Sequence, residues 1–395
     1  MRYTTSAKMF AAGTALFLFT SPALALDAND LVRKLNAALN LQTGNGLSAG
    51  SVTVDGSDVT LANSRLELGE GAGSLPLGTI ELEGVEESAG SYTVETMSFA
   101  DIEYTQDNAA VTASDLSISG IRIPADPNGN TVDALLLFKE ANGGRLEVKG
   151  NDESTLTIAS SRITTELADD ESSMKFEMHV EDIKGDLRTT KDAGSRRIAE
   201  DLGLDDIHGK VSMVAAWDLE PGTFAVQEFA IDFADIGRLD TTFSITGYTL
   251  DFLQSTNKLV KVLEDSDNPQ EAEQSADSIA FELLQQVNFN SAQIRFEDAG
   301  ITRKALDVIA KKDGKTGDDM AQMIKVIAPM MLARFNIPNL QKSSEALNTY
   351  LDDPSSLTIS AKPQSPVHFS TIMDAAMNAP NTIPHVLGVA VTAND

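Results

Sequence analysis

The clearest structural signal in the sequence reads Ser51-Val52-Thr53-Val54-Asp55-Gly56-Ser57-Asp58-Val59-Thr60-Leu61. Apolar and polar residues alternate on both sides of the turn-forming segment Asp55-Gly56-Ser57-Asp58. A period of two places successive side chains on opposite faces of a strand, and Gly56 suits the turn between the two strands. The stretch therefore predicts a β-hairpin with one apolar and one polar face.

The same alternation recurs between Leu47 and Arg188, and again beyond it. Runs with one apolar face and one Ser, Thr or acidic face lie at residues 79–82, 92–94, 110–113, 116–119, 146–148, 156–158 and 174–178. Further strand runs lie at residues 209–216, 224–233 and 242–246. Antiparallel strands with one side in water have this pattern, and the short gaps between runs favour meander connections. We predict an extended antiparallel amphipathic sheet.

After Tyr248 the spacing of apolar residues changes to that of a helix face. Asn268 before Pro269 is a typical helix start, because Pro is tolerated in the first turn. Helical spacing predicts helices at residues 250–263, 269–287, 302–312, 318–334, 343–351 and 370–377, with strands at 293–296 and 357–361. The predicted fold class is thus α+β and β-rich, with helices concentrated in the C-terminal third.

This change of period suggests how the chain is organised. Residues 26–248 form a predicted β-rich domain with a short N-terminal helix, and residues 249–395 form a region of mixed helix and strand. The pattern does not decide between two domains and one sheet that continues through both regions.

The N-terminus predicts an export signal. A segment with Arg2 and Lys8 precedes a short apolar run that ends in Ser21-Pro22-Ala23-Leu24-Ala25. The small residues Ala23 and Ala25 are typical of a cleavage site, so we expect a signal peptide over residues 1–25. A membrane anchor fits less well, because the apolar run is roughly half of the ~20 residues that a spanning helix needs. No Cys follows to take a lipid, so we expect release into the periplasm without a transmembrane anchor.

Composition narrows the classes of partner. The formal net charge is −29, and it becomes −31 if Arg2 and Lys8 leave with the signal peptide. Such a charge repels nucleic acid and anionic headgroups, so no nucleic-acid partner is expected, and solubility is the simplest reason for the acidic surface. The chain has no Cys, which excludes disulfides, Cys-ligated zinc, iron–sulfur clusters and a thiol nucleophile.

The motifs that could carry chemistry lack the context that the chemistry needs. Gly46-Leu47-Ser48-Ala49-Gly50 matches G-x-S-x-G, but a nucleophile elbow joins a strand to a helix, and here a hairpin follows. Residues 126–133 resemble the first half of a calcium loop, yet Thr131 stands where the loop needs Gly. A polar surface loop is the simpler interpretation of that segment.

Histidine gives no further site. The four histidines are His179, His208, His368 and His385. None has a second His or a carboxylate four residues later, so no H-E-x-x-H zinc helix is present. Pairing of two of them in space stays open. We predict no catalytic residue, no metal site and no cofactor.

The remaining candidate site is apolar. A Met-rich helix face is expected between residues 318 and 334, and Pro329 is expected to bend that helix. Its candidate ligand-binding residues are Met320, Met323, Ile324, Ile327, Met330 and Met331. Methionine adapts to irregular partners, so such a face can line a lipid groove. The simpler alternative is that the helix covers one end of the sheet.

Two stretches near the C-terminus resemble a known group of proteins. They read Asn290-Ser291-Ala292-Gln293-Ile294-Arg295-Phe296-Glu297-Asp298-Ala299-Gly300-Ile301-Thr302 and Leu357-Thr358-Ile359-Ser360-Ala361-Lys362-Pro363, the second continuing through Pro366-Val367 and closing on residues 387–394. They are similar to uncharacterised proteobacterial periplasmic proteins and, more distantly, to AsmA-like and YdgA-like envelope proteins. The resemblance implies an elongated antiparallel sheet whose apolar concave face handles lipid, and it brings no catalytic residues. AsmA-like proteins usually keep an N-terminal membrane anchor, so the expected release of this chain puts bridging between membranes in doubt.

Together these observations favour a non-enzymatic periplasmic protein of the cell envelope. The leading hypothesis is that the sheet binds or shields a lipid or another apolar ligand, because alternating strands need something to cover their apolar face. The alternative is a structural or interaction protein that docks envelope proteins, and a hydrolase of unknown substrate comes third. The sequence gives neither the ligand nor the oligomeric state.

Overall fold

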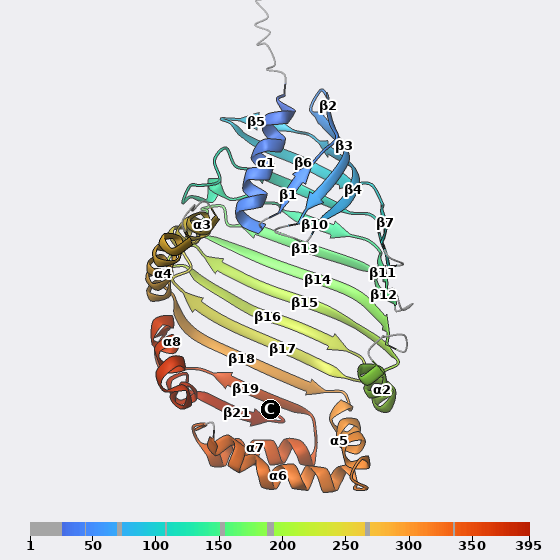
Figure 1. Cartoon of the computed structure of the whole chain (residues 1–395), viewed down its shortest axis with the longest axis vertical. Coiled ribbons are helices and arrows are strands. Elements are labelled where there is room, and N and C mark those ends of the chain that lie inside the picture. The colour runs from blue at the N-terminus through green and yellow to red at the C-terminus, as the bar shows by residue number, and fades with distance from the viewer. Residues whose placement is uncertain are drawn as a thin grey trace, which may run out of the picture.

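A computed structural model describes residues 26–43, 45–68, 73–106, 109–150, 155–187, 193–264, 269–334 and 336–395. The expected signal peptide, residues 1–25, lies outside the described residues. The described chain has an α+β fold in which 21 strands form one antiparallel sheet and most helices lie in the C-terminal half (Figure 1). No helix within these ranges is long and apolar enough to span a bilayer.

The strands of the N-terminal half are β1 Gly46–Ser48, β2 Ser51–Asp55, β3 Asp58–Glu67, β4 Ser74–Glu83, β5 Glu86–Ser88, β6 Ser91–Phe99, β7 Ile102–Gln106, β8 Ala109–Ala113, β9 Ser117–Ile123, β10 Glu140–Gly143, β11 Leu146–Lys149, β12 Thr155–Ile158, β13 Ser160–Leu167 and β14 Ser173–Asp186. The later strands are β15 Asp206–Asp218, β16 Thr223–Phe233, β17 Gly237–Thr246, β18 Asn288–Asp298, β19 Ser356–Ala361, β20 Val367–His368 and β21 Val389–Ala393.

The α-helices are α1 Ala28–Thr43, α2 Ala193–Leu202, α3 Leu250–Glu264, α4 Pro269–Gln286, α5 Ile301–Lys311, α6 Gly317–Arg334, α7 Leu340–Asp352, α8 Phe369–Asn378 and α9 Ile383–Val386. Two short 3-10 helices are η1 Val132–Ala134 and η2 Pro380–Thr382. The strand at residues 51–54 and the helices that the sequence predicts beyond Tyr248 all form, whereas α2 had no sequence signal that we recognised.

The sheet is a meander, as the short gaps between strand runs predict. The predicted hairpin forms, with Val54 opposite Val59 and Asp55 opposite Asp58. Several strand pairs lie end to end and together act as one long strand: β12 and β13 pair with different parts of β14. From β14 to β19 each strand pairs antiparallel with the next, and β21 pairs with β19. Neighbours along the chain are therefore neighbours in the sheet.

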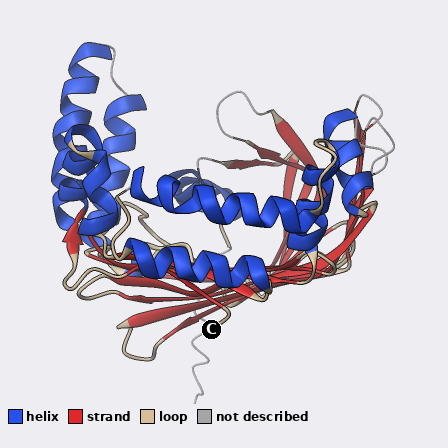
Figure 2. Ribbon diagram, turned by 90° about the horizontal axis from the view of Figure 1, so that it is seen from below, coloured by secondary structure: helices blue, strands red, loops and turns tan. Residues whose placement is uncertain are grey.

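The helices are inserted between neighbouring strands. α2 connects β14 to β15, α3 and α4 connect β17 to β18, and α5 to α7 connect β18 to β19. Figure 2 shows the sheet curved, with the helices on its concave side. Leu250 and Leu253 of α3 pack against Met174 and Trp217, which places the apolar face of the sheet on that concave side.

The main core lies in the N-terminal half of the sheet. Leu31 and Leu35 of α1 pack on the strands from β3 to β9, where Val59, Leu61 and Ile80 are 0% exposed. α1 is also held by polar contacts: the Tyr92 hydroxyl donates to Asp30 Oδ2 at 2.9 Å, and Lys34 Nζ lies 2.7 Å from the same oxygen. The bond from Lys34, with those from Tyr92 and Arg33, lowers the pKa of Asp30 to about 2.

The boundary expected near residue 248 falls inside the sheet. β17 lies before it and β18 after it, and the two strands pair along their whole lengths, from Gly237 opposite Asp298 to Thr246 opposite Asn288. The sheet thus continues from the β-rich region into the mixed region, with α3 and α4 as an insertion between two paired strands.

Candidate functional site

One apolar face runs across the second half of the sheet. A single row of directly opposed residues crosses seven strands, from β14 to β21: Val180, Val211, Ile231, Leu239, Phe296, Leu357 and Ala393. Strands in a sheet lie about 4.8 Å apart, so the six steps span about 29 Å. A parallel row includes Ile294, Ile359 and Val391. We call this surface the concave face.

The concave face is not fully covered by the protein. Leu239 is 38% exposed, Ile294 is 49% exposed and Ile359 is 47% exposed, although all three lie in paired strands. Complete burial of an Ile or Leu side chain stabilises a protein by about 1.5–3 kcal/mol, and a half-exposed one forgoes about half of this. Adjacent exposed side chains of this kind mark a surface that another apolar group can cover.

The opposite face of the same strands carries polar side chains that form hydrogen bonds and ion pairs with one another. We call it the outer face. Arg295 Nη1 donates to Thr358 Oγ1 at 3.1 Å and to Asp395 Oδ1 at 2.6 Å, and Thr358 is only 5% exposed beneath it. The Thr392 hydroxyl and Arg295 hold the pKa of Asp395 below its ordinary value. On β16, the Ser212 hydroxyl and then Arg238 lower the pKa of Glu228. The outer face thus pairs its charges within the sheet.

An aromatic cluster closes one end of the concave face. Trp217 donates from Nε1 to the Tyr248 carbonyl at 2.6 Å, and their rings lie 5.5 Å apart. Phe224 and Phe252 contact the Tyr248 ring at 5.8 and 5.3 Å. Burial raises the pKa of Tyr248, so its phenol stays neutral. This cluster fixes α3 against the sheet and limits the open surface to the strands beyond it.

The Met-rich helix predicted from the sequence is α6, and its candidate residues divide into two groups. Met320 is 5% exposed and packs with Leu306 and Ala310 of α5, and the half-buried Ile324 packs against the same cluster. The remaining four are exposed: Met323 at 36%, Ile327 at 46%, Met330 at 74% and Met331 at 48%. α7 lies beside β21 and α6 lies beyond α7, so these residues sit at the end of the sheet rather than above its middle (Figure 1).

The residues weighed for chemistry are dispersed. Ser48 donates to Glu67 Oε1 at 2.9 Å, and strand β2 follows it. His208 contacts Asp182 on the outer face, His179 is exposed on β14, and His368 and His385 lie at or in short helices. Among the described residues, no group of three His, Asp or Glu side chains could hold a metal ion.

The segment that resembles half a calcium loop connects two parts of the fold. Asp126 Oδ1 accepts hydrogen bonds from the backbone and side-chain nitrogens of Asn128, at 3.0 and 2.8 Å. Asn130 donates to Asp251 of α3 at 2.7 Å, and Gln254 of α3 donates to the Asn128 carbonyl at 2.9 Å. The loop therefore supports α3 on the sheet.

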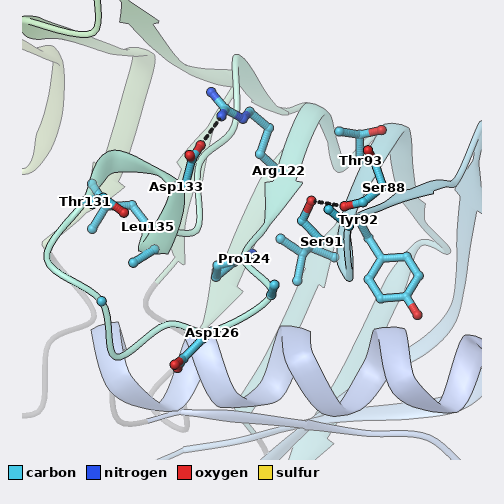
Figure 3. A pocket seen from close by; sticks show the side chains of 15 residues that line it. Ser88, Ser91, Tyr92, Thr93, Arg122, Pro124, Asp126, Thr131, Asp133 and Leu135 are labelled. Carbon is cyan, nitrogen blue, oxygen red and sulfur yellow. Dashed lines mark hydrogen bonds and ion pairs between the residues drawn. The ribbon is translucent and has the colours of Figure 1, made fainter.

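A cavity of about 470 Å³ lies beside this loop (Figure 3). Its arginine, Arg122, is paired with Asp133 at 2.9 Å, and the Ser91 hydroxyl donates to the Ser88 carbonyl at 2.6 Å. The Tyr92 hydroxyl points away from the cavity, toward α1. The positive charge of Arg122 is therefore already paired with a carboxylate and is not left for a ligand in the cavity.

The exposed part of the concave face was not predicted from the sequence. Leu239, Ile294 and Ile359 each follow the period-two pattern that identified the strands. The same pattern holds for the fully buried Val59 and Leu61, so alternation carries no signal for which apolar positions stay uncovered.

The comparison with protein families matched the C-terminal part of the chain. A family model described as "Uncharacterized protein" matches residues 230–394, which run from β16 to the end of β21. A search of the curated proteins found no match. Residues 290–302, 357–367 and 387–394 lie within the same matched region, and the description of that family names neither AsmA-like nor YdgA-like proteins.

Proposed function

We propose that the protein is a non-enzymatic protein of the periplasm that binds or shields an acyl chain or an outer-membrane lipid on its concave face. The observation that supports this most is the exposure of Leu239, Ile294 and Ile359 on strands whose outer face buries Thr358. An antiparallel sheet with one face in water usually buries its apolar face and exposes its polar face. Here the apolar side of β17 to β19 is left for a ligand.

The dimensions of the concave face suit a hydrocarbon chain. The hydrocarbon core of a bilayer is about 30 Å thick, so one leaflet contributes about 15 Å of extended chain. The row from Val180 to Ala393 is about twice that length at a spacing of about 4.8 Å per strand. Apolar chains need no directional partner, which agrees with a surface of aliphatic and aromatic side chains.

The first test is native mass spectrometry and lipid extraction of the purified protein. A bound lipid is expected, and a ligand-free protein whose core is fully packed would overturn the proposal. Binding is then measured with a fluorescent fatty acid. Ile294→Glu and Ile359→Glu should weaken binding by at least about tenfold, because a carboxylate is costly to bury in an apolar contact.

Matched controls lie one residue away on the same strands. Gln293→Glu and Ser360→Glu place the same carboxylate on the outer face. These variants should bind the fatty acid as the wild type does. Equal losses in all four variants would point to general damage of the sheet and would count against a site on the concave face.

A structural or interaction protein is the second candidate, because one edge of the sheet is open. β2 pairs with β3, and four of its five residues are exposed, including Val54 at 45%. An edge strand offers unpaired backbone groups to a strand of another protein. Crosslinking and pull-down from periplasm test this role: reproducible protein partners with no bound lipid would favour it over the first proposal.

A further inference from the structure

The exposed apolar residues of α6 form a continuous stripe. Five of the sixteen large apolar side chains that are strongly exposed among the described residues lie on this one helix. They are Met323, Val326, Ile327, Met330 and Met331, and we call them the α6 stripe. Their spacing of three and four residues places them along one side of the helix. Ala321 and Ala328 mark a neighbouring side that is used for packing, and Met320 is the buried residue at the N-terminal end of the side that carries the stripe.

The segment that carries the α6 stripe has a charge opposite to that of the whole chain. The net charge of the protein is −29, yet residues 301–342 contain eight Lys or Arg and four Asp, with no Glu. Two of the eight, Arg303 and Lys325, pair with Asp353 and Asp352 at the end of α7. Lys311, Lys312 and Lys315 are exposed in and after the end of α5, directly before α6. Arg334 is exposed at the other end of α6, four residues after Met330 and therefore on the stripe.

The exposed apolar residues of α4 and α8 lack this basic setting, and Ile198 of α2, which follows Arg196 and Arg197, is a single exposed residue rather than a stripe. α4 exposes Phe281 at 58% and α8 exposes Met377 at 76%. The charged residues of these two helices are all acidic: α4 contains no Lys or Arg, and the charged residue of α8 is Asp374. The coincidence of an exposed apolar stripe and basic residues is therefore a property of the α5–α6 end.

We propose that the α6 stripe and its flanking basic residues form a docking surface for a membrane that contains anionic phospholipid. A helix with exposed apolar residues and flanking Lys or Arg lies in the bilayer interface, with the apolar side chains about 5–10 Å deep. Each basic residue near an anionic surface contributes about 1 kcal/mol, and this attraction acts within a Debye length of about 8 Å. The carboxylates of the strands lie farther from the α6 stripe, so salt screens their repulsion of an anionic membrane docked there.

This surface is separate from the concave face and goes beyond the proposed lipid binding. α6 lies between α5 and α7 in the chain, and α7 separates it from β21, the strand at the end of the sheet that carries Val391 (Figure 1). A docked membrane would thus lie at the end of the concave face where a lipid could enter or leave.

The test is flotation of the purified full chain with vesicles of phosphatidylcholine alone and of phosphatidylcholine with phosphatidylglycerol. The wild type should float with the phosphatidylglycerol vesicles, less so at high salt and not with phosphatidylcholine alone. Val326→Ser with Met330→Gln, and separately Lys311→Glu with Lys312→Glu, should each reduce binding by at least about tenfold. These four side chains are exposed, so the fold should be retained, which circular dichroism verifies.

Control variants remove similar groups elsewhere. Ile198→Ser changes an apolar residue of α2 that is 56% exposed, and Lys210→Glu reverses an exposed lysine on β15. Both should float as the wild type does. A wild type that does not bind phosphatidylglycerol vesicles, or stripe variants that bind unchanged, would overturn the proposal.

Two further outcomes are distinguished by additional measurements. If ultracentrifugation without vesicles shows that the stripe variants lose a dimer that the wild type forms, the stripe is a contact between copies and the proposal fails. Fatty-acid binding by Ile294→Glu reports on the concave face alone. Vesicle docking can therefore stand if lipid binding on the sheet is disproved, and the reverse also holds.

Discussion

The two halves of the sheet share one strand pattern but differ in what covers their apolar face. In the N-terminal half, α1 lies on the strands, and Val59, Leu61 and Ile80 are 0% exposed. In the second half, Ile294 and Ile359 are about half exposed, at 49% and 47%, although they alternate with polar residues in the same way. Alternation therefore makes a sheet amphipathic, and only a covering element turns its apolar face into a core.

Two polar contacts serve the two faces differently. Asp30 of α1 bonds Tyr92 of β6, and this contact holds α1 on the apolar face of the N-terminal half. Arg295 bonds Thr358 and Asp395 on the outer face of the second half. The first contact holds a cover on the apolar face, and the second connects the sheet without covering that face.

The largest expected difference between the halves comes from one substitution made in each. Ile80→Ala should lower the free energy of unfolding by about 3 kcal/mol, because it leaves a cavity at a fully buried site. Ile294→Ala should cost less than about 1 kcal/mol, because much of its side chain already contacts water. Guanidinium unfolding followed by fluorescence of the single tryptophan, Trp217, measures both. Equal losses would mean that the concave face is covered in solution.

A smaller effect is expected at the polar contact that holds α1. Tyr92→Phe removes the hydroxyl that donates to the Asp30 carboxylate and should cost about 2 kcal/mol, since hydrogen bonds to charged groups contribute about 1.5–3 kcal/mol. Tyr350→Phe provides the comparison: its hydroxyl bonds Thr302 at 2.5 Å, a neutral pair worth about 1 kcal/mol. Urea denaturation of both variants checks the order. A smaller loss for Tyr92→Phe would show that α1 is not held through Asp30.

The same contact predicts a pH dependence that belongs to the N-terminal half. The pKa of Asp30 is lowered from 3.8 to about 2 in the folded protein. Its stabilisation is therefore complete above the unfolded pKa and is lost as the pH falls from about 4 to about 2. Solvent screening limits this contribution to about 1 kcal/mol. In Asp30→Asn, the free energy of unfolding should fall less between about pH 4 and pH 2 than it does in the wild type. An equal fall in both proteins would contradict a role for the Asp30 carboxylate in this pH dependence.

The smallest effect is expected on the outer face. Asp395 is bonded by Thr392 and Arg295, but its side chain is 50% exposed, so Asp395→Asn should cost about 0.5 kcal/mol or less. Arg295→Met should cost more, because Arg295 also covers the buried Thr358. Thermal unfolding of the two variants separates these contributions. If either variant lost more stability than Tyr92→Phe, the polar contacts of the outer face would contribute more than the contact that holds α1.

Local patterns of residues were enough to predict most helices and strands and the two faces of the sheet. The period-two runs, the hairpin at Asp55 to Asp58 and the helix start at Pro269 depend on neighbouring residues, so local patterns predicted them. The Met-rich character of α6 was likewise visible in the order of its residues. α2 was missed because its apolar pattern is short and its cover is a distant part of the chain.

Which apolar residues are core and which are surface depends on the tertiary structure. Val59 and Ile294 look alike in sequence, and the difference arises because α1 packs on the first and no described helix fully covers the second. On α6 the same holds for Met320 and Met330, since α5 packs on the N-terminal end of the helix, which carries Met320, and Met330 lies near the other end. Burial depends on contacts between residues far apart in the chain, and a period in the sequence records the face of an element but not its neighbour.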